Sequence, residues 1–334
     1  MAKKSGGKGK VKYKTPFKQI WKIQFLIRSL YLFPSYVQIE PTTKCNLKCK
    51  ICIRSRMESR VSGDMQFDLF KSIIDQLRRP IYATQAINIT GLGEPFMNPN
   101  IILMVRYAKS KGLNVMMDTN LTKVDDEILK DVIDSRLDTL VVSFDGASKE
   151  TFESIRVGSV FEKVIENIKL LLELKKKMNA DKPAIVLNST IREENVREIP
   201  EMIKTAEELG VNAIVFMKQA MPGENYRESK LFDAMPEEIF SSTKVKVTGC
   251  LDHLKSRCCA PRACYITFDG KVLPCYPIYE LIPREEYVHY QMGDLTKQLF
   301  REIWFSKRYR RLRTQIINGA SMPFCESCFA SKFQ

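Results

Sequence analysis

Short β-rich segments alternate with helical segments through residues 36–217, and this order constrains the fold more than any other feature. Six runs rich in β-branched and aromatic residues are expected to be strands: 36–40, 86–90, 114–119, 139–144, 184–190 and 213–217. Five segments with helical periodicity lie between them: 67–77, 101–110, 125–133, 161–177 and 195–209. This alternation predicts a parallel sheet with right-handed crossovers. We therefore expect an α/β fold, a partial (β/α)6 TIM-like barrel, with functional residues at the C-terminal ends of its strands.

Three cysteines follow the first expected strand with the spacing Cys-x3-Cys-x2-Cys: Cys45, Cys49 and Cys52. Structural zinc sites and ordinary iron–sulfur clusters use four protein ligands. A group of three therefore indicates a four-iron cluster in which one iron has no protein ligand. An open coordination position is typical of a reactive metal site rather than a structural one. A zinc knuckle whose fourth ligand lies elsewhere is the alternative.

Polar residues also follow the next three expected strands. The second strand leads into Thr90-Gly-Leu-Gly-Glu-Pro95, where two glycines let the backbone approach a ligand and Glu94 can accept from an ammonium group. Asp118 and Asn120 end the third strand, where they either face a substrate or cap a turn. The fourth strand ends around Ser143.

A second group of cysteines occupies the C-terminal quarter: Cys250, Cys258, Cys259, Cys264, Cys275, Cys325 and Cys328. Residues 265–275 are expected to form a β-hairpin whose turn presents Cys275 to a metal. Four of these thiols have the arrangement of one complete site, namely Cys258, Cys275, Cys325 and Cys328. Cys259 or Cys264 are alternatives to Cys258. A zinc ribbon is the competing interpretation, because four thiolates suit zinc equally well.

The three-cysteine spacing, directly after the first strand, resembles that of the radical S-adenosylmethionine (SAM) superfamily. In that superfamily the open iron of a [4Fe-4S] cluster binds the amino and carboxylate groups of SAM. An electron from the cluster cleaves SAM to methionine and a 5′-deoxyadenosyl radical, which abstracts hydrogen from a substrate. The resemblance implies that Cys45, Cys49 and Cys52 hold this SAM-binding cluster.

The resemblance also implies contacts with SAM. The segment with Gly91, Gly93 and Glu94 is similar to the family's Gly-Gly-Glu segment, which holds the SAM amino group, although Leu92 interrupts the glycine pair. Ser143 would contact the ribose. Arg156 would bind the carboxylate, a role suited to its planar guanidinium.

The C-terminal region resembles the SPASM extension in its shorter, twitch form, which carries one auxiliary cluster. This implies an auxiliary [4Fe-4S] cluster on the second cysteine group. We therefore expect a basic, amphipathic N-terminal segment (1–35), the radical SAM barrel (36–245) and a SPASM/twitch domain (246–334).

Cys250 lies between the barrel and this extension and is our first candidate for a hydrogen atom donor to a substrate radical. A donor would make the enzyme an epimerase. Transfer of an electron to the auxiliary cluster would instead make it a dehydrogenase. The alternative for Cys250 is a buried structural thiol.

The formal charge of +14 is concentrated near the two ends of the chain. Nine lysine and arginine residues precede Glu40, the first acidic residue, and a second basic cluster lies at residues 307–313. Residues 17–33 are apolar and aromatic with interspersed basic residues, which predicts an amphipathic helix that packs on the domain or makes peripheral contact with an anionic membrane. The cluster at 307–313 is a candidate docking surface for an acidic electron donor of the flavodoxin or ferredoxin type.

The sequence contains no secretory signal and no apolar run of membrane-spanning length, so we expect a cytoplasmic protein, with membrane association through residues 1–35 as the variant. About 35 residues precede the barrel, too few for a leader-binding domain. We therefore predict a small-molecule substrate, such as a sugar, nucleoside or lipid headgroup, that is dehydrogenated or epimerised. A peptide-modifying maturase with a separate leader-binding partner is the alternative. A zinc-ribbon protein that binds nucleic acid is the rival of another class, and nucleic acid is not the expected partner.

Overall fold

In the computed structural model the six expected strands form the parallel centre of one ten-stranded sheet. The structure describes residues 33–56, 62–78, 84–218, 243–249, 258–275, 278, 282, 284–320, 322 and 325. The central strands are β1 (Tyr36–Ile39), β2 (Ala86–Ile89), β3 (Asn114–Thr119), β4 (Thr139–Ser143), β5 (Ala184–Ile191) and β6 (Ala213–Lys218). They pair in parallel and in sequence order, which confirms the predicted fold class.

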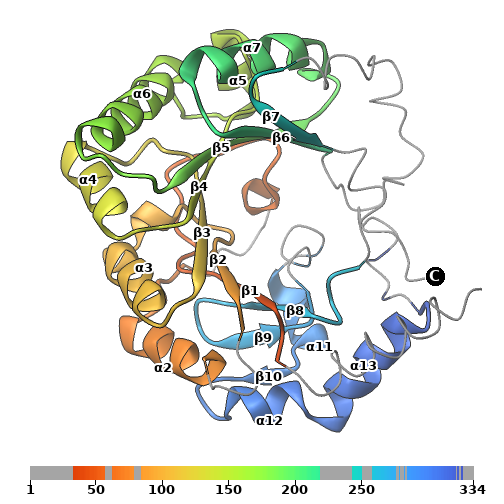
Figure 1. Ribbon diagram of the computed structural model, residues 1–334. Coiled ribbons are helices and arrows are strands. Elements are labelled where there is room, and N and C mark those ends of the chain that lie inside the picture. Colours follow the sequence, from red (N-terminus) through yellow and green to blue (C-terminus); the bar gives the residue numbers. More distant parts are fainter. Residues whose placement is uncertain are drawn as a thin grey trace, which may run out of the picture.

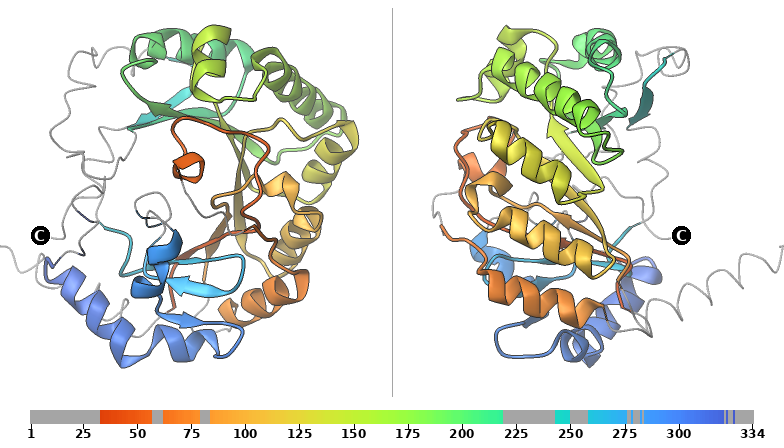
Figure 2. Two further views of the ribbon diagram at one scale, coloured as in Figure 1. Left: turned by 180° about the vertical axis from the view of Figure 1, so that it is seen from behind. Right: turned by 60° about the vertical axis from the view of Figure 1, so that its left-hand side comes forward.

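Helices connect these strands and cover the convex face of the curved sheet (Figures 1 and 2). They are α2 (Phe67–Leu77), α3 (Ile101–Ser110), α4 (Asp126–Asp134), α5 (Lys149–Ile155), α6 (Phe161–Lys177) and α7 (Ile199–Leu209). The five expected helices are therefore present. Short 3-10 turns precede or follow strands at η1 (Ile53–Arg56), η2 (Pro95–Met97) and η3 (Val196–Glu198).

Alternate residues along each strand face opposite sides of the sheet. One set packs under the helices in the main core and includes Val37, Ile87, Val115, Leu140 and Ile185. The other set faces the concave side, which we call the lumen, and includes the polar residues Gln38, Asn88, Asp118, Ser143 and Asn188. The barrel thus has an apolar outer layer and an inner wall in which polar residues alternate with apolar ones such as Met116, Val141 and Val186.

Four further strands extend the sheet at its edges. β7 (Lys246–Gly249) pairs in parallel with β6, and β8 (Ala263–Ile266) pairs in parallel with β1. β9 (Lys271–Leu273) returns antiparallel to β8, which confirms the expected hairpin, and β10 (Gly293–Asp294) pairs with β9. The sequence interpretation missed β7 and the pairing of β8 with β1. The boundary expected at residue 246 falls directly before a strand of the barrel's own sheet.

The C-terminal elements lie at the β8–β10 end of the sheet (Figure 1). They are η4 (Arg284–Glu286), α11 (Tyr287–Tyr290), α12 (Phe300–Trp304) and α13 (Lys307–Ile317). A second, smaller apolar cluster gathers here around Tyr265, Leu273 and Cys275. It lies on the other side of β8 from the main core, which contains Cys264.

The proposed amphipathic segment lies almost wholly outside the described residues, which begin at Phe33. Phe33 itself is buried, and its ring centroid lies 5.3 Å from that of Phe300 and 5.6 Å from that of Phe305. The described end of the segment therefore packs on α12. This contact does not support the hypothesis that the segment binds a membrane. Within the described residues, no helix combines the length and the apolar character needed to cross a membrane.

Candidate active site: two cysteine groups at the barrel

The loop after β1 carries Cys45, Cys49 and Cys52 and lies along the end of α5. Its residues 48 and 50 donate backbone hydrogen bonds of 2.9 Å to residues 157 and 155. Cys49 is buried, whereas Cys45 and Cys52 are half-buried. Burial raises the pKa of the Cys49 thiol to about 11 and also raises that of Cys45. Iron binding would release these protons, because the thiolate is the ligand.

Three free thiols in one loop are the donor set that a four-iron cluster with one open iron needs. Among the described residues, no three Cys, His, Asp or Glu side chains converge as the ligands of one ion would. The Cys45 sulfur also accepts hydrogen bonds from Leu47 N (3.5 Å) and Asn120 Nδ2 (3.9 Å). Such donors are typical around cluster sulfurs.

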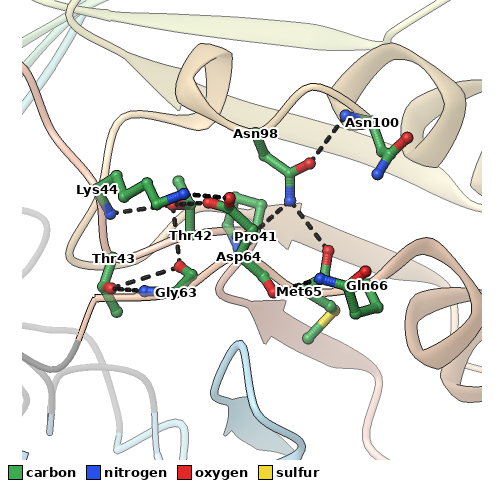
Figure 3. A network of polar contacts seen from close by, with 10 residues as sticks. All are labelled: Pro41, Thr42, Thr43, Lys44, Gly63, Asp64, Met65, Gln66, Asn98 and Asn100. Atoms are coloured by element: carbon green, nitrogen blue, oxygen red, sulfur yellow. Dashed lines mark hydrogen bonds and ion pairs between the residues drawn. The ribbon is translucent and has the colours of Figure 1, made fainter.

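The residues before Cys45 are fixed by a network with the segment that precedes α2 (Figure 3). Thr42 Oγ1 donates to Asp64 Oδ1 at 2.6 Å, and Lys44 Nζ lies 2.6 Å from Asp64 Oδ2. Asn98 Nδ2 donates to the carbonyl oxygen of Pro41 at 2.7 Å. The cysteine loop therefore begins from a fixed position.

Both glycines of the segment after β2 pack against residues 40–44. A Cβ on Gly93 would lie 2.4 Å from the carbonyl oxygen of Thr42 and 2.5 Å from that of Lys44. A Cβ on Gly91 would lie 2.6 Å from Glu40 Cγ. The close approach that these glycines permit is thus to the cysteine loop of the same chain. Their contact with SAM stays a prediction.

Glu94 is buried between this segment and the end of β3. Its Oε1 accepts from Thr119 Oγ1 (2.6 Å) and Phe96 N (3.3 Å), and its Oε2 accepts from Asn120 N (2.7 Å). Burial raises the pKa of Glu94 to about 7, although the hydrogen bonds from Asn120 and Thr119 oppose this. A nearby cation would stabilise the buried carboxylate.

Arg156 is held by a buried carboxylate that the sequence interpretation did not identify. Its Nε donates to Asp145 Oδ2 at 2.5 Å, and Asp145 Oδ1 accepts from Thr190 N at 2.6 Å. Burial opposes the charge of Arg156, but Asp145 and the Cys49 thiol together raise its pKa. Among the described residues, Arg156 donates a side-chain hydrogen bond only through Nε. Its Nη atoms are therefore available to donate to a ligand. The guanidinium is therefore charged, oriented and close to the cysteine loop.

Asn120 was expected to face a substrate or to cap a turn, and it caps a turn. Its Oδ1 accepts from Thr122 N at 3.0 Å and from Thr122 Oγ1 at 2.6 Å. Its Nδ2 donates to Asn46 Oδ1 at 3.2 Å, in addition to the Cys45 contact. Asn120 thereby joins the Glu94 site to the cysteine loop. Its position after a strand was the only sequence signal for this role.

Asp118 lies on the lumen face of β3. Asn88 Nδ2 donates to both of its oxygens, at 3.3 and 3.4 Å. This contact turns Asn88 Oδ1 away from Asp118, and that oxygen is buried and has no hydrogen-bond partner among the described residues. The same is true of Asn188 Oδ1 on β5. Ser143 lies half-buried on the same face at the end of β4.

Four cysteines of the second group gather at the smaller apolar cluster. Cys275 belongs to this cluster, and Cys258, Cys259 and Cys325 pack against it. The Cys325 sulfur accepts from Met322 N at 3.3 Å. Cys328 and Cys250 lie outside the described residues, so their proposed roles as ligand and as hydrogen donor stay predictions.

Cys264 lies apart from these four cysteines. It pairs with Val37 in the sheet and belongs to the main core under the helices. Burial strongly raises the pKa of its thiol, with the Arg313 guanidinium opposing. Because its neighbour Tyr265 packs in the smaller cluster, Cys264 and the other cysteines lie on opposite sides of β8.

Arg313 does not belong to an exposed basic surface, which corrects part of the expected donor-docking cluster. It is 0% exposed, and its guanidinium carbon lies 4.0 Å from the ring centroid of Trp304 and 4.7 Å from that of Tyr309. Burial lowers the pKa of Arg313 to about 10. The helical period of α13 turns this residue inward, while its exposed basic residues are Lys307, Arg308, Arg310 and Arg311.

Two family models match the chain in the regions that carry the two cysteine groups. The model described as the radical SAM superfamily matches residues 39–181, and the SPASM model, described as an iron–sulfur cluster-binding domain, matches residues 258–329. The chain is a radical SAM enzyme with a SPASM domain. The two domains imply a SAM-bound [4Fe-4S] cluster, an auxiliary cluster and SAM. The zinc-knuckle and zinc-ribbon alternatives are therefore wrong.

Relatives of this radical SAM protein span most of its length. The tungsten-containing aldehyde ferredoxin oxidoreductase cofactor-modifying protein of Pyrococcus furiosus is 27% identical over 88% of this chain and 86% of its own. The AdoMet-dependent heme synthase of Methanosarcina barkeri is 27% identical over 84% of this chain and 85% of its own. The mycofactocin maturase MftC of Mycobacterium tuberculosis is 27% identical over 51% of this chain and 41% of its own.

Solved structures share the fold of this SPASM enzyme. Streptococcus suis SuiB bound to S-adenosylmethionine aligns with a TM-score of 0.68 and 14% identity, over 97% of this chain and 77% of its own. The structure of anSMEcpe with bound AdoMet aligns with a TM-score of 0.66 and 16% identity, over 88% of each chain.

Proposed function

We propose that this radical SAM enzyme abstracts hydrogen from a small molecule that carries hydroxyl or amine groups and is bound against the lumen wall. The SAM-binding cluster, when present, supplies the electron that cleaves SAM to the 5′-deoxyadenosyl radical. The chain's own residues hold SAM, orient the substrate and exclude water. Dehydrogenation or epimerisation of a sugar, nucleoside or lipid headgroup is the reaction we favour.

SAM is held in this proposal by three residues at the C-terminal ends of strands. Arg156 binds the SAM carboxylate through its Nη atoms, because Asp145 fixes the guanidinium through Nε. Glu94 accepts from the SAM ammonium, which offsets the cost of its burial. Ser143, on the lumen face of β4, contacts the ribose.

Two lumen amide oxygens that have no hydrogen-bond partner in the described part of the chain support the assignment of the substrate class. Buried polar atoms in proteins are nearly always hydrogen-bonded. Asn88 Oδ1 and Asn188 Oδ1 have no partner among the described residues, so in this proposal they accept from the ligand. Hydroxyl and amine groups supply such donors. The lumen-facing positions of the described strands β1–β6 include one carboxylate, Asp118, and no lysine or arginine. This wall suits a neutral or cationic substrate better than a polyanion.

A peptide is the second candidate substrate, because two similar proteins are named for peptide or maturase functions. A relative is named as a maturase, and a structural neighbour is described as bound to a precursor peptide. The cofactor-modifying and heme synthase relatives point instead to small molecules. We rank the small molecule first, because these two relatives match over most of their length and the maturase over less than half.

The deciding experiment combines metal analysis with SAM cleavage. After anaerobic reconstitution we expect about eight irons per chain, and about four in a Cys45/Cys49/Cys52 triple alanine variant. The reduced wild-type protein should form 5′-deoxyadenosine, and the triple variant should not. A protein that holds eight irons and binds SAM but never cleaves it would contradict the proposal.

The substrate class is tested with deuterated candidates. A true substrate should accelerate 5′-deoxyadenosine formation and transfer deuterium into it. Asn88→Leu should abolish this acceleration and leave the slow, substrate-free cleavage of SAM unchanged. Transfer from a peptide, and from none of the sugars, nucleosides or headgroups, would favour the second candidate.

A further inference from the structure

Glu40, the residue that follows β1, is fully buried and connects three segments of the chain. Its Oε1 accepts from Tyr265 Oη at 2.8 Å and from Leu92 N at 3.3 Å. Its Oε2 accepts from Phe268 N at 3.1 Å. A buried carboxylate with three donors is strongly held, and each donor segment is held by it in turn.

The segments that Glu40 joins belong to the two cluster sites. Leu92 lies between Gly91 and Gly93, in the segment that leads to Glu94. Tyr265 is on β8, and its ring packs in the same apolar cluster as Cys275. The side chain of Glu40 thus lies between the glycine segment on one side and the auxiliary domain on the other.

Close packing restricts both the glycine segment and the β8–β9 hairpin where they meet the residues around the cysteine loop. A Cβ on Gly91 would lie 2.6 Å from Glu40 Cγ and 2.9 Å from Tyr265 Oη. A Cβ on Gly63, which precedes the Asp64 of Figure 3, would lie 2.1 Å from the ring of Phe268. The β8–β9 hairpin therefore contacts the barrel at two points around the cysteine loop.

We propose that the Glu40–Tyr265 hydrogen bond is a strut through which the auxiliary domain sets the position of the SAM-binding segment 91–94. Glu40 and Tyr265 are positioning residues in this proposal: they act on SAM through Leu92 N–H and touch neither SAM nor a cluster. The inference rests on the proposed role of segment 91–94 in holding SAM. It predicts that the Tyr265 hydroxyl, on β8, controls the affinity for SAM.

Tyr265→Phe tests the strut, because it removes the hydroxyl and keeps the ring. The matched control is Tyr287→Phe, which removes a hydroxyl from the same apolar cluster and none of the three hydrogen bonds described for Glu40. In reconstituted protein we expect Tyr265→Phe to weaken SAM binding about tenfold at unchanged iron content, since hydrogen bonds to charged groups have about this effect. The control should bind SAM as the wild type does.

Hydrogen exchange of the peptide that contains Leu92 supplies a second readout, which needs no turnover. Tyr265→Phe should speed exchange in this peptide relative to Tyr287→Phe, including in any preparation that has lost iron. Glu40→Gln should also weaken SAM binding, and the Glu40→Gln/Tyr265→Phe double variant should be no weaker than Glu40→Gln alone.

Unchanged SAM affinity and unchanged exchange in Tyr265→Phe would overturn the strut. Additive losses in the double variant would overturn it as well. Glu94→Ala shows whether a negative result concerns only the Glu40–Tyr265 hydrogen bond or also the proposed role of segment 91–94 in binding SAM. If Glu94→Ala abolishes SAM binding and Tyr265→Phe has no effect, only the strut is wrong. If Glu94→Ala also has no effect, segment 91–94 does not hold SAM.

Discussion

Arg156 Nε lies 2.5 Å from Asp145 Oδ2, in an ion pair whose acid is fully buried and whose base faces the cysteine loop. Asp145 is anchored further by Thr190 N, and Asn195 Nδ2 donates to its carbonyl oxygen at 2.9 Å. Strand β5 and the turn after it therefore fix Asp145, and Asp145 in turn orients the Arg156 guanidinium.

Asp145→Asn should weaken SAM binding at least tenfold, because the guanidinium loses its orienting charge. It should also lower the free energy of unfolding by about 3 kcal/mol, since one partner of a buried pair is removed. Calorimetric SAM titration and denaturant unfolding measure the two effects. The control Asp131→Asn disrupts the exposed pair with Arg106 and should change stability by less than about 1 kcal/mol. Equal effects of the two variants would contradict this role.

The raised pKa of Glu94, about 7, predicts that SAM binding depends on pH. Burial favours the protonated form of Glu94. Between the ordinary carboxyl pKa and about pH 7, the folded protein therefore holds a proton that the unfolded chain has lost, and Glu94 is fully ionised only above pH 7. An ammonium ligand needs that ionised form. SAM affinity should therefore fall toward tenfold per pH unit below 7. Titrations between pH 6 and 8 test this, and the dependence should be absent in Glu94→Gln.

Gly93→Ala should displace the cysteine loop, because its Cβ would lie within 2.5 Å of two backbone carbonyl oxygens that cannot rotate away. We expect a loss of about 1–3 kcal/mol or more in the free energy of unfolding, together with weaker retention of the SAM-binding cluster. Gly210→Ala is the control: Gly210 has a φ of +75°, but a Cβ there would meet no atom within 4 Å, so only backbone strain results. Iron counts that are normal in Gly93→Ala would contradict the prediction.

Iron analysis of single variants should separate Cys258 from Cys264. Cys258→Ala should lose up to four irons, because Cys258 packs against the smaller apolar cluster, which also contains the expected ligand Cys275. Cys264→Ala should keep all of its iron and lose only about 1 kcal/mol of stability, since its thiol lies in the main core. The reverse pattern would assign the ligand to Cys264.

Cys250→Ala tests the hydrogen donor. If Cys250 donates hydrogen to the substrate radical, the variant should cleave SAM at the normal rate and form no epimerised product. Mass spectrometry of the product in deuterated water follows the donated atom. Epimerised product in the variant would exclude this role for Cys250. An oxidised product in wild type and variant alike would instead favour dehydrogenation, in which the auxiliary cluster accepts the electron.

The features of the fold that could be predicted from the sequence are those that depend on residues close together in the chain. The strands and helices of the barrel follow from hydrophobic periodicity, and the hairpin before Cys275 follows from its Asp269-Gly270 turn. The pairing of β8 with β1 joins Ala263 to Tyr36, a separation that no local pattern records. Local periodicity could have placed Arg313 on the buried face of α13, but its charge suggested a surface role.

The candidate site divides in the same way. Cysteine spacing identified the cluster ligands as candidates, and family likeness led to Glu94 and Arg156. The residues that orient these groups, Asp145 and Asn120, were not recognised as such because their roles depend on which strand ends meet in space. Single acidic or amide residues after strands are too common to single out.

The β1–β8 pairing also bears on the order of events during synthesis. One edge of β1 stays open until residues 263–266 have left the ribosome, more than 220 residues after β1 itself. A nascent barrel with an exposed parallel edge is slow to complete and prone to aggregate. Cys45, Cys49 and Cys52 are synthesised soon after β1, whereas Cys258 and Cys275 arrive with β8 and β9, so these two sets of thiols are brought together only when this pairing forms.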